Sequence, residues 1–84
     1  MNLSVFPNPV RATLHLLVSG QTGDEIHIVL SDLSGRQLGA DHPGRLAEGL
    51  YQFSFNVTGL TPGVYFVTAS TAETKAVTKV IITR

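Results

Sequence analysis

Hydrophobic and polar residues alternate with a period of two along most of this 84-residue chain. Successive side chains of a β-strand point to opposite faces, so this alternation predicts strands with one buried face. No stretch repeats apolar residues at i, i+3, i+4 and i+7 over three turns, as an amphipathic helix would. Five runs show the alternation most clearly: Ala12–Val18, Glu25–Ser31, Tyr51–Val57, Val64–Ala69 and Lys75–Thr83.

Each alternating run divides its side chains between two faces, and the apolar faces predict a shared core. In the first three runs, the residues expected to face inward are Ala12, Leu14, Leu16, Val18, Ile26, Ile28, Leu30, Tyr51, Phe53, Phe55 and Val57. In the fourth run, one face holds Tyr65, Val67 and Ala69. In the last run, one face holds Ala76, Thr78, Val80 and Ile82, and the opposite, outward face holds Lys75, Val77, Lys79 and Ile81.

Turn-forming residues separate the runs and so indicate the number of strands. They lie at Gly20–Asp24, Ser34–Gly35, His42–Gly44, Gly59–Gly63 and Ser70–Glu73. Two shorter pieces, Leu3–Phe6 and Arg36–Ala40, bring the predicted strands to seven. Short strands at regular spacing, each with one polar face, predict two antiparallel sheets packed face to face. The expected fold is all-β, a seven-stranded antiparallel immunoglobulin-like β-sandwich, in a single domain over residues 1–84.

The composition agrees with strands and excludes several kinds of function. The β-branched residues Val, Ile and Thr together supply 22 positions. Six Lys and Arg balance six Asp and Glu, so the chain lacks the basic excess that nucleic acid phosphates attract. The absence of cysteine excludes a disulfide scaffold, a thiolate zinc site and a cysteine nucleophile. No apolar stretch approaches the roughly 20 residues of a membrane-spanning helix.

Candidate catalytic and metal-binding residues are few and scattered along the chain. His15 and His27 are expected on the outward faces of separate strands, and His42 is expected in a turn. Acidic residues fall near turns, where carboxylates cap the backbone and stay solvated: Asp24, Glu25, Asp32, Asp41 and Glu48. A metal centre or a catalytic triad needs such groups to converge. We therefore expect no enzymatic activity, no metal and no cofactor.

Four short motifs follow one another along the chain: Phe6–Val10, Leu30–Arg36, Leu60–Val67 and Thr78–Ile82. The two prolines of the first motif lack the N–H donor of a central strand, so a rigid, extended bend is expected there. In this order, the four motifs resemble the type A C-terminal sorting domain of proteins exported by the type IX (Por) secretion system of Bacteroidota. The resemblance covers essentially the whole chain.

The resemblance implies a function without chemistry of its own. Members of the family are fused to the C-terminus of a larger cargo protein, which enters the periplasm by an N-terminal signal peptide. The outer-membrane translocon recognises the sorting domain, and a sortase-like cysteine peptidase then removes it. The cargo is released or joined to anionic lipopolysaccharide at the cell surface. Because no signal-peptide pattern follows Met1, this chain is expected to be a module excised from such a protein.

The resemblance also assigns residues. Those that match the family motifs are Pro7, Asn8, Pro9, Asp32, Gly35, Arg36, Gly63 and Tyr65. The terminal segment most associated with recognition contains Lys79, Val80, Ile81 and Ile82.

The alternation of the last run places lysines on either side of its apolar outward residues. Such a surface suits the docking of a partner, and an edge strand would also offer main-chain pairing. We therefore expect the translocon to recognise Lys75, Val77, Lys79, Val80, Ile81 and Ile82. Gly35 and Gly63 are expected to act first through turns that need a permissive backbone.

Other interpretations of the same residues remain open from sequence. Val77 and Ile81 could be covered by a neighbouring loop or by the parent protein. The domain could be a passive fibronectin-III-like spacer or adhesion module, or a carbohydrate-binding module of a cell-surface enzyme. Such binding needs an exposed platform of rings, whereas Tyr51, Phe53 and Phe55 have the spacing of core residues. An exposed terminal edge strand would also allow an edge-paired homodimer.

Overall fold

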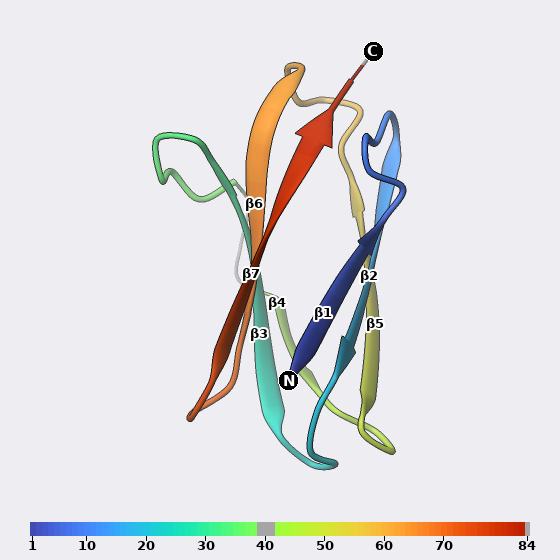
Figure 1. Cartoon of the computed structure of the whole chain (residues 1–84), viewed down its shortest axis with the longest axis vertical. Coiled ribbons are helices and arrows are strands. Elements are labelled where there is room, and N and C mark those ends of the chain that lie inside the picture. The colour runs from blue at the N-terminus through green and yellow to red at the C-terminus, as the bar shows by residue number, and fades with distance from the viewer. Residues whose placement is uncertain (39–41, 84) are drawn as a thin grey trace.

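The computed structural model describes residues 1–38 and 42–83, which form seven strands in two antiparallel sheets. The first sheet has the order β1-β2-β5, and the second has the order β4-β3-β6-β7. The strands are β1 (Asn2–Phe6), β2 (Thr13–Ser19), β3 (Glu25–Asp32), β4 (His42–Arg45), β5 (Leu50–Asn56), β6 (Gly63–Ser70) and β7 (Lys75–Ile82). Figure 1 shows the sheets facing each other, with β1 and β7 nearest the viewer. The predicted all-β sandwich is confirmed.

The predicted inward faces meet between the sheets and form the core. The buried apolar residues are Val10, Leu14, Leu16, Val18, Ile26, Ile28, Leu30, Leu46, Phe55, Val57, Tyr65, Val67, Ala69, Val80 and Ile82. Tyr51 and Phe53 are partly buried and pack against this cluster. The prediction for Ala12 is wrong, because β2 begins only at Thr13 and Ala12 lies exposed before it. Burial of each large side chain contributes about 1.5–3 kcal/mol, which favours this register over a one-residue slip.

The fourth strand lies farther along the chain than the sequence indicates. Instead of Arg36–Ala40, the strand is β4, which pairs with the first half of β3. Residues 39 and 40 of the predicted strand lie outside the described residues, and Gln37 forms only an isolated bridge. The residues of β4 include Pro43 and Gly44, which indicate a turn, but an edge strand tolerates proline because its outer N–H needs no partner. Glycine is required because a Cβ at Gly44 would overlap the Tyr51 ring from the facing sheet.

The sandwich differs from an immunoglobulin constant-type domain in the placement of β4. In constant-type domains the fourth strand joins the sheet of the first, second and fifth strands. Here β4 joins β3, β6 and β7 instead. One feature is shared with Greek-key sandwiches: the Tyr65 hydroxyl, near the start of β6, donates to the Thr61 carbonyl at 2.6 Å. This contact matches the tyrosine corner of such folds.

The segment after β1 carries the chain from one sheet to the other. β1 pairs with β2, but Val10 forms a parallel bridge with Ile82 at the end of β7. Between them lie Pro7 and Pro9, each preceded by a cis peptide bond. Proline suits this crossing because the chain leaves one hydrogen-bonded ladder before it joins the next, and the missing N–H donors break neither. The predicted bend is therefore present, and it connects the N-terminal motif to the C-terminal strand.

Candidate functional site

The outward face of β7 presents two lysines and two exposed apolar side chains. Lys75, Val77, Lys79 and Ile81 all point away from the core, and Val77 and Ile81 are 54% and 38% exposed. The other members of the predicted recognition set lie on the opposite face. Val80 and Ile82 are buried in the core, so their side chains are not available to a partner of the folded domain.

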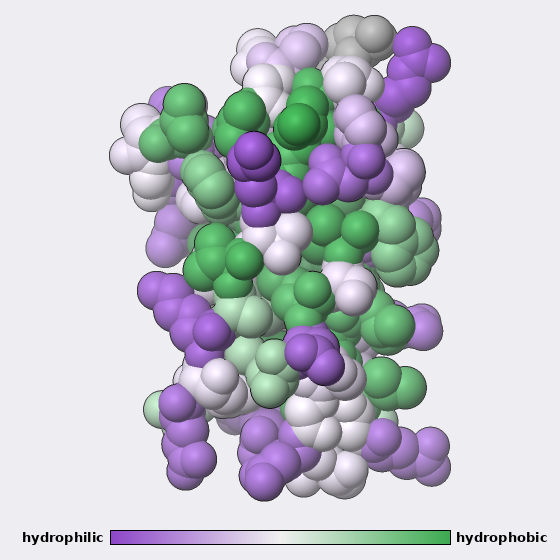
Figure 2. All heavy atoms as spheres, in the orientation of Figure 1, coloured by the Kyte–Doolittle hydropathy of each residue, from purple (hydrophilic) through white to green (hydrophobic). Residues whose placement is uncertain are grey.

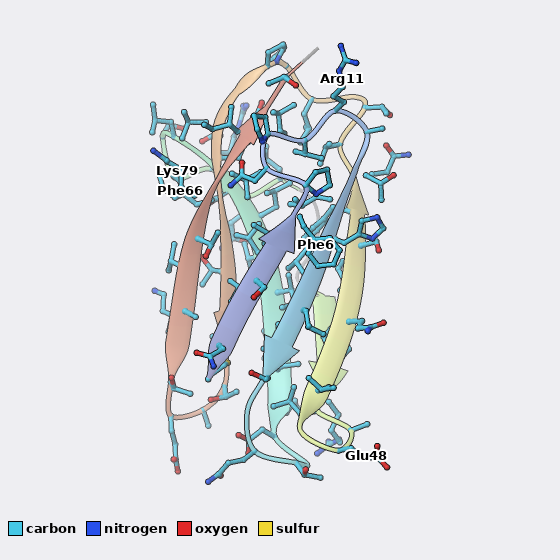
Figure 3. The ribbon with its side chains drawn as sticks, turned by 45° about the vertical axis from the view of Figure 1, so that its right-hand side comes forward. Phe6, Arg11, Glu48, Phe66 and Lys79 are labelled. Atoms are coloured by element: carbon cyan, nitrogen blue, oxygen red, sulfur yellow. The ribbon has the colours of Figure 1, made fainter. Side chains whose placement is uncertain are left out.

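Residues of β6 extend this surface beyond the last strand. Antiparallel pairing places Val64 beside Ile81, Phe66 beside Lys79 and Thr68 beside Val77. Figure 3 shows Phe66 and Lys79 side by side on the outer side of the sheet. We call the set Val64, Phe66, Lys75, Val77, Lys79 and Ile81 the outer patch. Val64 and Phe66 were missed as candidates, although apolar residues on both faces of Val64–Ala69 signalled that the outer face is not purely polar.

Among the described residues, the lysines of the outer patch lack the ion pairs that Arg36 and Arg45 form. Arg36 Nε lies 3.2 Å from Asp32 Oδ2, and Arg45 Nη2 lies 3.6 Å from Glu25 Oε2. Within residues 1–38 and 42–83, neither Lys75 nor Lys79 has a carboxylate partner. The outer patch is therefore an apolar surface whose two positive charges have no carboxylate partner among the described residues, although the chain as a whole is neutral.

The outer face of the other sheet has a different chemistry. Its exposed residues are mostly uncharged and polar, namely Asn2, Ser4, Thr13, His15, Gln52, Ser54 and Asn56. Phe6 and Leu50 are also exposed there, and the Phe6 ring stacks on His15 with centroids 5.5 Å apart. Between the two sheets, apolar residues gather along the side of the molecule where β1 and β7 lie (Figure 2). The cationic, apolar surface thus belongs to the sheet that ends in β7.

The N-terminal motif closes part of the edge of β7. The Asn8 side chain donates from Nδ2 to the Lys79 carbonyl at 3.2 Å, and its Oδ1 accepts from the Ile81 N–H at 3.1 Å. Val10 continues the contact, because its N–H donates to the Ile81 carbonyl at 2.9 Å and its carbonyl accepts from the Thr83 N–H at 2.8 Å. The Asn8 amide offers one donor and one acceptor, as a backbone residue of an added strand would. The first and last motifs of the chain therefore form one structural unit.

The middle motif is a turn held together by Asp32. Its Oδ1 accepts hydrogen bonds from the Ser34 N–H, the Ser34 hydroxyl and the Arg36 N–H, at 3.0, 2.7 and 3.0 Å. The Ser34 hydroxyl contributes most to holding the pKa of the Asp32 carboxyl below its ordinary value. The Arg36 and Ser34 N–H groups and the Arg36 charge act in the same direction, against desolvation. Gly35 has a φ of 93°, which confirms the expected need for a permissive backbone.

The third motif supports the fold at the start of β6. Gly63 has a φ of 157°, a backbone conformation that L side chains rarely adopt, and it pairs with Ile82 of β7, which confirms the expected need for glycine. Tyr65 is buried, and its hydroxyl reaches the loop before β6. The motif residues outside β7 therefore hold turns and strand ends in place, and Asp32, Arg36, Gly63 and Tyr65 line one pocket where the second and third motifs meet.

The groups considered for catalysis stay apart. His15 contacts the Ser54 hydroxyl and His27 contacts Glu25, each at 3.2 Å on a different sheet. The part of the chain that the structure describes holds no group of three His, Asp or Glu residues able to bind a metal. Asp41 lies outside the described residues, and so does the side chain of His42. Nor do the described residues include a helix long and apolar enough to cross a membrane.

The aromatic residues of β5 do not form an exposed platform for a sugar. Phe55 is buried, and Tyr51 and Phe53 lie on the same inward face. The rings pack on one another, with centroids 6.3 Å apart for Tyr51 and Phe53 and 5.0 Å apart for Phe53 and Phe55. Their bulk fills the space between the sheets, as their spacing indicated.

Comparison with known proteins identifies the family of the chain. No curated protein matches the chain. A family model described as the secretion system C-terminal sorting domain matches residues 4–83. Domains of this family act as secretion signals and not as catalysts, which supports the prediction that the chain is not an enzyme. Such a signal works with the secretion machinery, on a fused cargo protein, and directs export through the outer membrane to the cell surface or beyond. The chain therefore belongs to the C-terminal sorting domains of type IX secretion.

Proposed function

We propose that the folded domain is recognised by the type IX translocon through the outer patch. The recognition residues are Lys75, Val77, Lys79 and Ile81 of β7 with Val64 and Phe66 of β6. Val80 and Ile82 contribute through the fold, because their side chains are buried. The sandwich then serves as a scaffold that presents β7 in one fixed conformation.

The observation that supports this proposal most is that two lysines without a carboxylate partner among the described residues lie beside exposed apolar side chains. Desolvating an apolar surface favours association, and a charge without an internal partner can gain one from a binding protein. The other sheet offers mostly polar groups, together with Leu50 and the Phe6 ring, and this ring is already stacked on His15. The translocon surface that fits the outer patch is therefore apolar with carboxylates at its rim.

Further steps follow from the family. We propose that the domain is fused to the C-terminus of a cargo protein and crosses the periplasm with it. After export, a sortase-like cysteine peptidase removes the domain, and the cargo is released or joined to anionic lipopolysaccharide. The domain does no chemistry in any of these steps.

The proposal is tested with a reporter fused ahead of residues 1–84 and preceded by a periplasmic signal peptide. The fusion is expressed in a Bacteroidota host with and without its type IX translocon, and reporter is measured in the medium, on the surface and in the periplasm. Export is expected only with the translocon. Lys75→Ala combined with Lys79→Ala is expected to lower export at least about tenfold, since two charge contacts are lost.

Arg45→Ala is the matched control, because Arg45 is an exposed cation at the opposite edge of the same sheet. Its export is expected to equal that of the unaltered domain. Equal export by the double-lysine variant would contradict recognition through the outer patch. Periplasmic retention in both strains, with the domain folded, would leave a spacer or adhesion module as the remaining interpretation.

A further inference from the structure

The edge of β7 is only half closed. β7 is the last strand of its sheet, so one side of its main chain faces away from β6. The groups on this side come from alternate residues. At one end of the strand these groups are occupied: Asn8 binds the Lys79 carbonyl and the Ile81 N–H, and Val10 binds the Ile81 carbonyl. By the same alternation, both main-chain groups of Lys75 and Val77 and the N–H of Lys79 point outward.

No described residue hydrogen-bonds to the outward main-chain groups in this second half of the edge. The main-chain hydrogen bonds outside the strand ladders include none to the outward groups of Lys75 or Val77. The inner face is also less sealed here, since Ala76 and Thr78 are half-buried whereas Val80 and Ile82 are buried. β1, which lies on this side, pairs with β2 in the other sheet (Figure 1).

We infer that Lys75–Lys79 is a strand-addition site for an extended segment of the export machinery that carries carboxylates on either side of an apolar residue. The inference deepens the proposed function, on which it rests for the source of the segment. An added strand would satisfy the outward main-chain groups. Its side chains would lie beside Lys75, Val77 and Lys79, where an acidic, an apolar and a second acidic residue complement the charge and the hydrophobicity.

Charge disfavours a second copy of this chain as the occupant. Antiparallel self-pairing centred on Val77 would use all the free edge groups. That register places Lys75 of each copy opposite Lys79 of the other, and like charges directly opposite each other destabilise a pair of strands. The length of the site is also limited. Asn8 and Val10 already occupy the edge beyond Lys79, so a partner strand must end there.

The inference is tested with short synthetic peptides and the isotope-labelled chain of 84 residues. In the first peptide, threonines alternate with a glutamate, a valine and a second glutamate, in that order. The second peptide has lysine in place of both glutamates. Added at about 1 mM, the acidic peptide is expected to slow hydrogen exchange at the Val77 and Lys79 amides, and the basic peptide is not. An acidic peptide with N-methylated main-chain amides is expected to lose this protection, since it cannot complete the ladder.

Two variants test the same contacts from the side of the domain. Lys75→Glu combined with Lys79→Glu is expected to weaken the acidic peptide at least about tenfold and to confer binding of the basic peptide. Val77→Pro removes one outward N–H while keeping both lysines, and edge strands accept proline. It is expected to abolish protection of the edge. If this variant does not fold, the N-methylated peptide tests the same hydrogen bonds on the unaltered chain.

Each other result would overturn strand addition. Chemical-shift changes confined to the lysine side chains, without amide protection, would mean charge association only. Protection of Val77 that grows with protein concentration, with a doubled mass by light scattering, would mean that a second copy takes the edge. No effect of any peptide, together with translocon-dependent export of the reporter, would reject the strand-addition site and leave the sorting function standing.

Discussion

The side chain of Asn8 is bonded to the main chain of Ile81 across 73 positions of sequence, with the Ile81 N–H 3.1 Å from Asn8 Oδ1. Its Nδ2 also donates to the Lys79 carbonyl. One amide thus holds two residues of the last strand. The N-terminal motif is therefore part of the structure that fixes β7, and not only a bend after β1.

Asn8→Ala is expected to destabilise the domain by about 1–2 kcal/mol, because two hydrogen bonds to the main chain of β7 are lost. The measurement is urea unfolding together with hydrogen exchange at Ile81, whose amide should exchange faster. Asn2→Ala is the control, since Asn2 is exposed in β1 and should change stability by less than about 0.5 kcal/mol. Equal effects of the two substitutions would contradict the role of Asn8.

The Asn8 contact could not have been predicted from local sequence. Two prolines around Asn8 predict a bend, and they do so correctly, but they do not say which strand the bend meets. The partner is fixed by the sheet order, which places β1 and β7 on the same side of the sandwich. The alternation of apolar and polar residues predicts which face of a strand is buried, but it does not predict which strands lie beside it.

The faces themselves were predictable because burial has a strong energetic preference and a period of two. Lys79 outward and Val80 inward follow directly from that period, and the structure confirms both. The prediction failed at β4 because Pro43 and Gly44 signal a turn by their local preferences. There, edge position removes the cost of proline, and the Tyr51 ring from the facing sheet requires glycine.

The Asp32 turn gives stability a dependence on acid pH. The pKa of Asp32 is lowered from 3.8, first by the Ser34 hydroxyl. A carboxyl whose pKa is lower in the folded state stabilises the fold above its unfolded pKa, and this contribution disappears as pH falls through the folded pKa. Asp32→Asn should therefore lower stability at neutral pH, and its difference from the unaltered chain should shrink as the pH falls below about 4.

Urea unfolding at several pH values measures this difference, and an NMR titration of the Asp32 carboxyl carbon gives its midpoint directly. Glu73→Gln is the control, because Glu73 is an exposed acid in the turn between β6 and β7. The difference in stability between this variant and the unaltered chain should not shrink as the pH falls. A midpoint for Asp32 at or above 3.8 would refute the proposed effect of the turn.

Substitutions at Gly35 and Gly59 distinguish backbone strain from steric crowding as the reason why a position needs glycine. A Cβ would meet no atom within 4 Å at either position, but only Gly35 has a positive φ. Gly35→Ala is expected to cost about 1–2 kcal/mol, because an L-residue is strained there. Gly59→Ala should be neutral or stabilise by up to about 1 kcal/mol, since alanine restricts the unfolded chain. Thermal unfolding of both variants tests this, and equal shifts would exclude strain as the cause.

Tyr65→Phe is expected to destabilise the domain by about 1 kcal/mol, because the hydroxyl bond to the Thr61 carbonyl is lost while the ring still fills the core. Tyr51→Phe is the matched control. No hydrogen bond from the Tyr51 hydroxyl occurs among the described residues, so its loss should cost less than about 0.5 kcal/mol. If urea unfolding gives both variants the same midpoint, the bond to Thr61 does not stabilise the fold.

Val80 and Ile81 are neighbours in sequence on opposite faces of β7, and they distinguish folding from recognition. Val80→Ala removes two methyl groups from the core and is expected to cost about 1.5–3 kcal/mol. Ile81→Ser alters an outward side chain and keeps the main-chain contacts to Asn8 and Val10, so it should cost less than about 1 kcal/mol.

Export of the reporter by each variant is compared with its stability at a temperature where both are folded. Ile81→Ser is expected to lower export although it is the more stable variant, and Val80→Ala is expected to be exported normally. The reverse order would mean that export depends on the stability of the sandwich and not on the outer patch.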